Sequence, residues 1–152
     1  MARNQARPLS PHLTIWKWGP HMAVSIFHRA TGSALAIAGG VLFTWWLVAA
    51  AMGKQAYARF IDCVTYDAPA AAPGAPVDAA AHGGLTWFWL VVLIGLSWAF
   101  FQHMASGVRH FVLDTGAGYE LRTNKTGSVA VFAFSIIATI LLWAGILGGV
   151  FH

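Results

Sequence analysis

Three long apolar stretches constrain the fold of this chain more than any other feature of its sequence. They cover residues 30–52, 85–113 and 127–151, and each is close to the roughly 20 residues that a helix needs to cross the bilayer core. A backbone inside the bilayer has no water to bond, and three spans cannot close a barrel, so each stretch is predicted to be helical. The sequence therefore predicts an all-α integral membrane protein with three transmembrane helices.

The composition excludes the usual soluble classes. Of the 152 residues, 58% are hydrophobic and only 9% are charged, whereas soluble domains carry about 25% charged residues. The net charge of +4 is small and scattered, so we expect no nucleic-acid partner. The single cysteine, Cys63, allows neither an internal disulfide nor a cysteine-built metal site. Any metal must therefore use the seven histidines.

The segments outside the predicted spans carry unequal numbers of basic residues. Residues 1–29 and 114–126 lie on one side of the membrane, and residues 53–84, rich in Ala, Pro and Gly, form a loop on the other. The basic residues of the first side and its span ends are Arg3, Arg7, Lys17, Arg29, Arg109, Arg122 and Lys125; those of the second are Lys54 and Arg59. The positive-inside rule therefore predicts a cytoplasmic N-terminus and a periplasmic first loop.

Two polar clusters lie at membrane depth, where ionisable side chains are costly and usually face a partner, a cofactor or water. The first is SIFHRATG at residues 25–32, and the second is HMASGVRH at residues 103–110, on the same side of the membrane. His103 lies about 15 Å inside its span, by the rise per residue of a helix. Either hydrogen bonds between helices, or iron on one ring nitrogen and an acceptor on the other, would satisfy it.

The spacing of the histidines limits which metal sites are possible. His103 and His110 return to nearly the same helix face about 10 Å apart, which is too far for one shared mononuclear site. The first and third spans contain no histidine, so a second axial ligand to a haem would come from a partner subunit. Gly107, one turn after His103, leaves room either for a flat macrocycle or for close helix packing.

The first cluster offers hydrogen-bond donors near the membrane edge. Arg29 either extends to the lipid headgroups or, together with His28, donates to carboxylates or to a carbonyl oxygen. Ser25 lies one turn before Arg29 on the same face and adds a neutral donor. Haem propionates and a quinone carbonyl are the membrane ligands that match these donors.

Taken with the opening segment RPLSPHL at residues 7–13, the motifs SIFHRATG and HMASGVRHFVLD resemble the cytochrome b membrane-anchor subunits of succinate dehydrogenase (respiratory complex II). The resemblance covers nearly the whole chain. It implies a helical bundle formed with a second three-span anchor subunit, with one b-type haem held between the two. It also implies an iron–sulfur subunit and a flavoprotein subunit docked on the inner face.

The resemblance also implies roles for single residues near the haem. His103 matches the family's axial ligand to the haem iron, and His28 and Arg29 match positions near the propionates. Arg109 and His110 lie in the motif with a less specific role, which we interpret as an inner-face or propionate contact.

A ubiquinone site is implied beside these positions. Ser25 and Arg29 match the family's quinone-site residues, with Ile26 and Trp18 as apolar walls. Asp114 either assists proton delivery or is a solvated residue that ends a helix, and the second reading is the commoner one. Trp16 departs from the family, whose members often have tyrosine there, and the long first loop is a second departure.

We therefore predict a non-catalytic anchor chain of a succinate:ubiquinone oxidoreductase, acting in the tricarboxylic acid cycle and respiratory electron transport. The alternatives are a quinol:fumarate reductase anchor or another small b-type cytochrome, a haem-free tether for soluble subunits, and a small transporter or channel subunit. The third span has no ionisable residue, which weakens the last alternative. Residues 1–29 carry no signal-peptide core, and RPLSPHL begins too early to follow a presequence, so we expect a bacterial inner membrane rather than a mitochondrial one.

Overall fold

Three long helices dominate the structure, which is a computed structural model describing residues 17–67 and 82–149. The first runs over Pro20–Ala51, the second over Trp87–Asp114 and the third over Leu121–Leu147, and each is long and apolar enough to cross a membrane. The segment RPLSPHL, Trp16 and the last residues of the predicted third span lie outside the described residues. The prediction of an all-α protein with three transmembrane helices is confirmed.

The first long helix is built from three consecutive elements. They are α1 (Pro20–Ala34), a π-helical turn η1 (Leu35–Gly39) and α2 (Gly40–Ala51). The helix begins well before residue 30 because Pro20 stands in its first turn, where a fixed φ and a missing N–H cost nothing. The SIFHRATG motif therefore lies entirely within α1.

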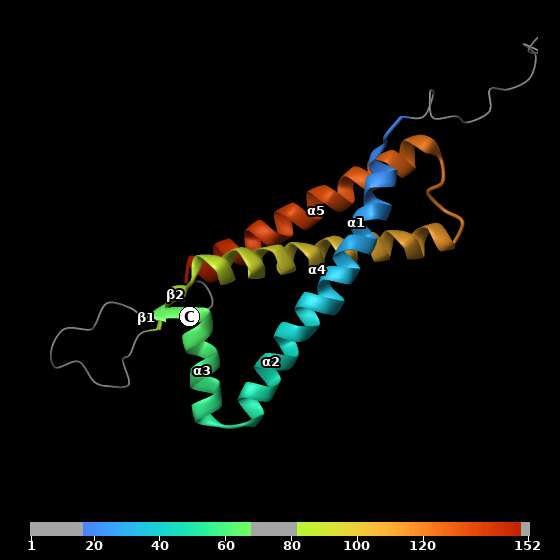
Figure 1. Cartoon of the computed structure of the whole chain (residues 1–152). Coiled ribbons are helices and arrows are strands. Elements are labelled where there is room, and N and C mark those ends of the chain that lie inside the picture. Colours follow the sequence, from blue (N-terminus) through green and yellow to red (C-terminus); the bar gives the residue numbers. More distant parts are fainter. Residues whose placement is uncertain (1–16, 68–81, 150–152) are drawn as a thin grey trace, which may run out of the picture.

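The second and third long helices are joined by a tight connection. The second is α4 (Trp87–Asp114) and the third is α5 (Leu121–Leu147), which begins earlier than residue 127. Gly116 and Gly118 adopt positive φ values of 85° and 81°, a conformation that glycine enters without steric cost. Because of this turn, α5 packs antiparallel along α4, and α1 crosses and contacts both (Figure 1).

The interior of the three-helix bundle mixes polar residues with apolar ones such as Val24 and Val131, and its outer surface is largely apolar. The buried polar residues are Thr31, Gln102, Ser106, Ser128, Ser135 and Thr139. Their hydroxyls bond mostly to helix carbonyls one turn back, as in Ser128 Oγ to the Asn124 carbonyl at 2.8 Å. Large apolar side chains such as Ile37, which is 70% exposed, point outward. Buried hydroxyls and exposed apolar side chains are typical of membrane helices, whose outer faces contact lipid and whose mutual contacts use small residues and hydrogen bonds.

Residues 53–84, predicted as a loop, contain ordered structure at both ends. Helix α3 (Lys54–Val64) follows a turn at Gly53, whose φ is 91°, and leads into a two-stranded antiparallel sheet of β1 (Thr65–Asp67) and β2 (His82–Leu85). The helix forms because Phe60 and Val64, four residues apart, bury one face against Ala49 of α2. The loop prediction rested on the Ala/Pro/Gly-rich run that follows α3 and did not take this apolar spacing into account.

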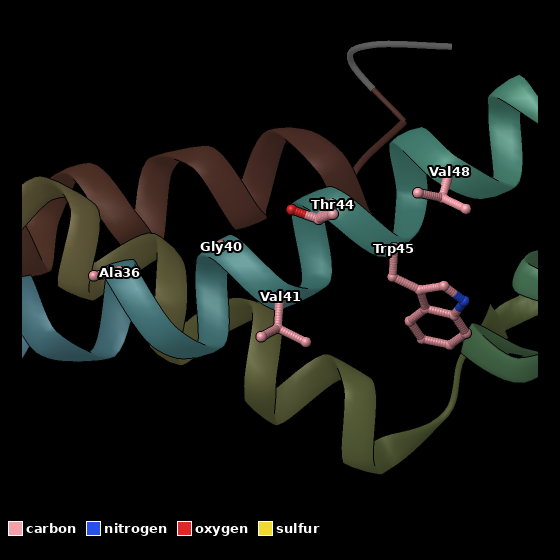
Figure 2. A pocket seen from close by; sticks show the side chains of 6 residues that line it. All are labelled: Ala36, Gly40, Val41, Thr44, Trp45 and Val48. Carbon is pink, nitrogen blue, oxygen red and sulfur yellow. The ribbon is translucent and has the colours of Figure 1, made fainter.

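Helix α2 diverges from α4 and α5 as it leaves the bundle (Figure 1). A groove of about 570 Å³ lies along η1 and α2, which supply its lining residues (Figure 2). The groove is lined by Ala36, Gly40, Val41, Thr44, Trp45 and Val48. It holds no ionisable side chain, so the chemistry suggested by the sequence motifs lies elsewhere, at the opposite end of the first long helix.

Candidate site at the histidine pair

The two sequence motifs meet at a pair of stacked histidine rings. His28 on α1 and His103 on α4 have ring centroids 4.0 Å apart and planes within 9° of parallel. A third ring, His110 of α4, lies edge-on to His28 at 5.2 Å. Both members of the pair are half-buried between their helices. The structure thus brings together residues that are 75 positions apart in the sequence.

The hydrogen bonding of His103 fixes which ring nitrogen remains available. Its Nδ1 lies 3.0 Å from the backbone carbonyl oxygen of His28. A carbonyl oxygen only accepts, so Nδ1 must carry the proton and donate it. The Thr31 hydroxyl lies 3.4 Å from the same nitrogen, and it donates to the Phe27 carbonyl at 2.6 Å. In the neutral ring Nε2 of His103 is then the unprotonated nitrogen, as a metal-ligating imidazole requires.

Two glycines let the rings fit between the helices. A Cβ atom on Gly32 would lie 2.9 Å from Cε1 of His103, closer than side chains normally approach. A Cβ atom on Gly107 would lie 3.9 Å from Cε1 of His28, an ordinary contact. Each glycine follows the histidine of its own helix by four residues and faces the histidine of the other. The neighbour of Gly107 is therefore a ring of this chain, which favours close helix packing as its role.

A serine of α4 holds the second ring. Ser106 is fully buried, and its Oγ lies 2.6 Å from Nδ1 of His28. The same hydroxyl lies 2.7 Å from the Gln102 carbonyl and 3.0 Å from the His103 carbonyl. The sequence analysis missed Ser106, Thr31 and Gly32, although the repeated spacing His-x-x-x-Gly at residues 28–32 and 103–107 is a visible signal for such a crossing.

Of the predicted quinone-site residues, Ser25, Ile26 and Arg29 lie on α1, and Trp18 precedes the helix. The Arg29 guanidinium donates to Oγ of Ser25 at 3.3 Å, so the structure brings these two side chains together. Arg29 is exposed, and it lies about 100° around the helix axis from His28. Ile26 and Trp18 are 47% and 63% exposed, so neither is enclosed by this chain.

The remaining residues of the second motif tie α4 to its surroundings. Arg109 donates to Oδ1 of Asn124 on α5 at 2.6 Å, a contact that the sequence analysis did not foresee. Asp114 is exposed and is the last residue of α4, which matches a solvated residue at a helix end. Gln102 accepts a hydrogen bond from Ser135 of α5 at 2.7 Å, while its buried Nε2 has no partner among the described residues.

The fold and the site together define a three-span membrane protein whose first two spans are joined by stacked histidines near one end of the bundle. The family comparison gives this class a name. The chain belongs to the succinate dehydrogenase/fumarate reductase transmembrane subunit family, whose model matches residues 3–142. The resemblance predicted from the motifs is thereby confirmed.

Individual relatives agree over most of the chain. The succinate dehydrogenase cytochrome b556 subunit of Paracoccus denitrificans is 34% identical over 135 residues, covering 89% of this chain and 88% of the relative. The cytochrome b556 subunit of Rickettsia felis is 31% identical and covers 90% of each chain. The mitochondrial cytochrome b560 subunit of Mus musculus is 29% identical, over 88% of this chain and 68% of the relative. The three apolar helices and the bacterial relatives support a multi-pass bacterial membrane protein.

Proposed function

We propose that this chain is the cytochrome b membrane anchor of a succinate:ubiquinone oxidoreductase. It would hold one b-type haem together with a second anchor subunit and form part of the site where ubiquinone is reduced. Succinate oxidation would take place on a flavoprotein subunit, joined to the membrane part by an iron–sulfur subunit. The chain itself would supply binding residues and no catalytic side chain. The observation that carries the proposal is the hydrogen-bonding state of His103.

His103 would hold the haem iron through one ring nitrogen, and both its hydrogen bonding and the small number of nearby ligands fit that role. Donation from Nδ1 to the His28 carbonyl fixes the tautomer and leaves Nε2 as the ligand nitrogen. Within the described residues no group of three or more His, Cys, Asp or Glu side chains converges as a metal site would need. A metal that takes one nitrogen from this chain and its other ligands from a macrocycle and a partner fits this donor set. When bound, haem b supplies a one-electron redox centre.

The other members of the first motif fit anionic and carbonyl ligands. Arg29 and His28 would serve haem propionates, and Arg29 with Ser25 would serve a quinone carbonyl, with Ile26 and Trp18 as apolar walls. The bond between Arg29 and Ser25 supports a shared donor site on the outer face of α1. A guanidinium beside a quinone carbonyl stabilises the negative charge that develops there before protonation. The exposure of Arg29 suits a site completed by partner subunits.

Topology and partners follow from the same proposal. The described basic residues gather at the end of the bundle that carries the histidine pair, apart from Lys54 and Arg59 at the other end. That end would face the bacterial cytoplasm and receive the iron–sulfur and flavoprotein subunits, with the segment after α2 on the periplasmic side. The relatives named above are all succinate dehydrogenase subunits, which favours succinate oxidation over fumarate reduction.

The first test is a set of reduced-minus-oxidised difference spectra of the complex purified in mild detergent. We expect a b-type band in the wild type, and its loss or shift in His103→Ala, because the ring nitrogen that would hold the haem is removed. His21→Ala is the matched control, since His21 is an exposed histidine on α1 and should leave the band unchanged. A wild-type complex without haem would refute the proposal and favour a haem-free tether.

The quinone assignment has its own test. Arg29→Lys keeps the charge but loses the planar fork of donors, so ubiquinone reduction should fall about tenfold or more while succinate oxidation by an artificial acceptor is retained. Arg122→Lys, an exposed arginine at the same end of the bundle, should change neither rate. An equal fall of both rates in Arg29→Lys would assign a structural role to Arg29.

A further inference from the structure

Ser106 differs from the other buried serines of the bundle in what its hydroxyl meets. Ser128 is equally buried, but its Oγ contacts only a carbonyl of its own helix, that of Asn124. Ser106 makes the same kind of bond to the Gln102 carbonyl and also lies 2.6 Å from a ring nitrogen on a different helix. That second contact links α4 to the side chain of His28.

The single hydroxyl proton of Ser106 allows two hydrogen-bond arrangements with the same consequence. If the hydroxyl donates to the Gln102 carbonyl, its oxygen accepts from a proton on Nδ1 of His28. If it donates to Nδ1 instead, the ring proton lies on Nε2. In both arrangements Nδ1 of His28 is engaged by Ser106, and Nε2 is the ring nitrogen left for another ligand.

The position of His28 in turn affects His103. The two rings lie nearly parallel at 4.0 Å, so the His28 ring covers one face of the His103 ring. Nδ1 of His103 donates to the backbone carbonyl of the same residue, His28. The main chain of residue 28 is held by helix α1, whereas its ring depends on side-chain contacts. Within the described residues, the side-chain hydrogen-bond partner of that ring is the Ser106 hydroxyl.

We propose that Ser106 is a positioning residue that holds the His28 ring flat against His103 and thereby sets the surroundings of the haem-ligand position. This inference rests on the proposed function and deepens it, because it names a residue that acts on the site through His28. It predicts that the Ser106 hydroxyl influences the spectrum and midpoint potential of the bound haem through the His28 ring, because Ser106 contacts His103 only at its backbone carbonyl and not at its ring.

The test compares Ser106→Ala with Ser128→Ala in the purified complex. Each substitution removes one buried hydroxyl from a helix interior, so the two are matched in volume and burial. We expect Ser106→Ala to shift both the haem midpoint potential and the low-spin electron paramagnetic resonance signal, with haem content retained. Ser128→Ala should leave both unchanged. Equal shifts in the two variants would overturn the proposal, because they would report loosened packing.

A double-mutant cycle separates action through His28 from other routes. In a His28→Ala background, Ser106→Ala should add no further shift, since the group that it positions is gone. An undiminished shift in that background would overturn the proposal. Ser106→Cys, which keeps a weaker donor of similar size, provides a second variant if Ser106→Ala fails to assemble, and its shift should be the smaller of the two. The proposal would be refuted if neither Ser106→Cys nor Ser106→Ala shifted the potential or the signal relative to the wild type.

Failure of this inference is distinguishable from failure of the proposed function. A wild-type complex that lacks a b-type band refutes the proposed function and, with it, the inference. A wild-type complex that carries the band, with Ser106→Ala identical to it in potential and signal, refutes the inference alone.

Discussion

The two ends of the first long helix meet α4 in opposite ways. At the α1 end, the helices touch through imidazole rings, two glycines and hydrogen bonds of 2.6 and 3.0 Å. At the α2 end they diverge, and α3 folds back so that aromatic rings fill the space. Trp45 of α2 contacts Phe60 of α3 with ring centroids 4.7 Å apart and Trp89 of α4 at 5.9 Å.

This difference shows that the contact between the helices depends on close fit and defined hydrogen bonds at one end, and on apolar side-chain volume at the other. Close approach at the α1 end requires the absence of a side chain at Gly32, and the polar groups there have defined partners. Contacts at the α2 end are mostly apolar, apart from the hydrogen bond that Trp89 Nε1 donates to the Cys63 carbonyl at 2.9 Å, so similar volumes can replace one another at modest cost. We therefore expect the ligand-binding residues to lie at the α1 end, where the packing is close and the polar groups have defined partners.

The largest effect that this comparison predicts is that of Gly32→Val. The first added carbon would lie 2.9 Å from Cε1 of His103, and a branched side chain would add two more carbons, so the ring pair must separate. We expect the haem content per complex to fall at least tenfold, measured from the pyridine haemochrome spectrum.

Graded controls make that prediction specific to the ring contact. Gly107→Ala adds a carbon at an ordinary contact distance of 3.9 Å from His28, and its effect on haem content should be small. Gly95→Ala, on the same helix, meets no described atom within 4 Å and should have none. Normal haem content in Gly32→Val would mean that the helices tolerate separation at this end, which would remove the contrast between the two ends.

The sequence predicted the spans and the two motifs but not how the motifs face each other. Hydropathy depends on length and composition alone, so residues 30–52, 85–113 and 127–151 could be recognised without any knowledge of packing. The rotation of α1 against α4 depends on which small residues allow close approach. The His-x-x-x-Gly spacing in each helix indicates that they can cross closely, but the stacking of His28 on His103 and the bond between His28 and Ser106 depend on that rotation.

The helix after α2 was missed for a different reason. Residues 53–84 have a composition typical of a loop, and α3 occupies only Lys54–Val64 at the start of that range. Its apolar residues are buried only because Gly53 turns the chain back and brings Phe60 against α2. Tertiary contact therefore decided the structure of this segment, whereas its average composition did not.

The smaller predicted effect is that of Phe60→Ala at the α2 end. Phe60 is 9% exposed and packs with Ala49 and Val64, so its truncation should weaken the docking of α3 by about 3 kcal/mol. Hydrogen exchange of the α3 backbone amides, followed by mass spectrometry, should accelerate roughly 100-fold, since each 1.4 kcal/mol is a factor of ten. The haem spectrum should stay unchanged, because no hydrogen bond or ring contact of the histidine pair involves α3.

Tyr57→Ala provides the matched control for that variant, since Tyr57 is an aromatic residue one turn earlier on α3 that is 39% exposed. Its removal should accelerate exchange much less than Phe60→Ala does.

The decisive result is the combination of the exchange rate of α3 and the haem spectrum. If Phe60→Ala altered the haem spectrum as well as the exchange of α3, the two ends would be energetically coupled through the first long helix. The π-helical turn η1 at Leu35–Gly39, which separates α1 from α2, would then transmit packing changes rather than isolate the histidine end from them.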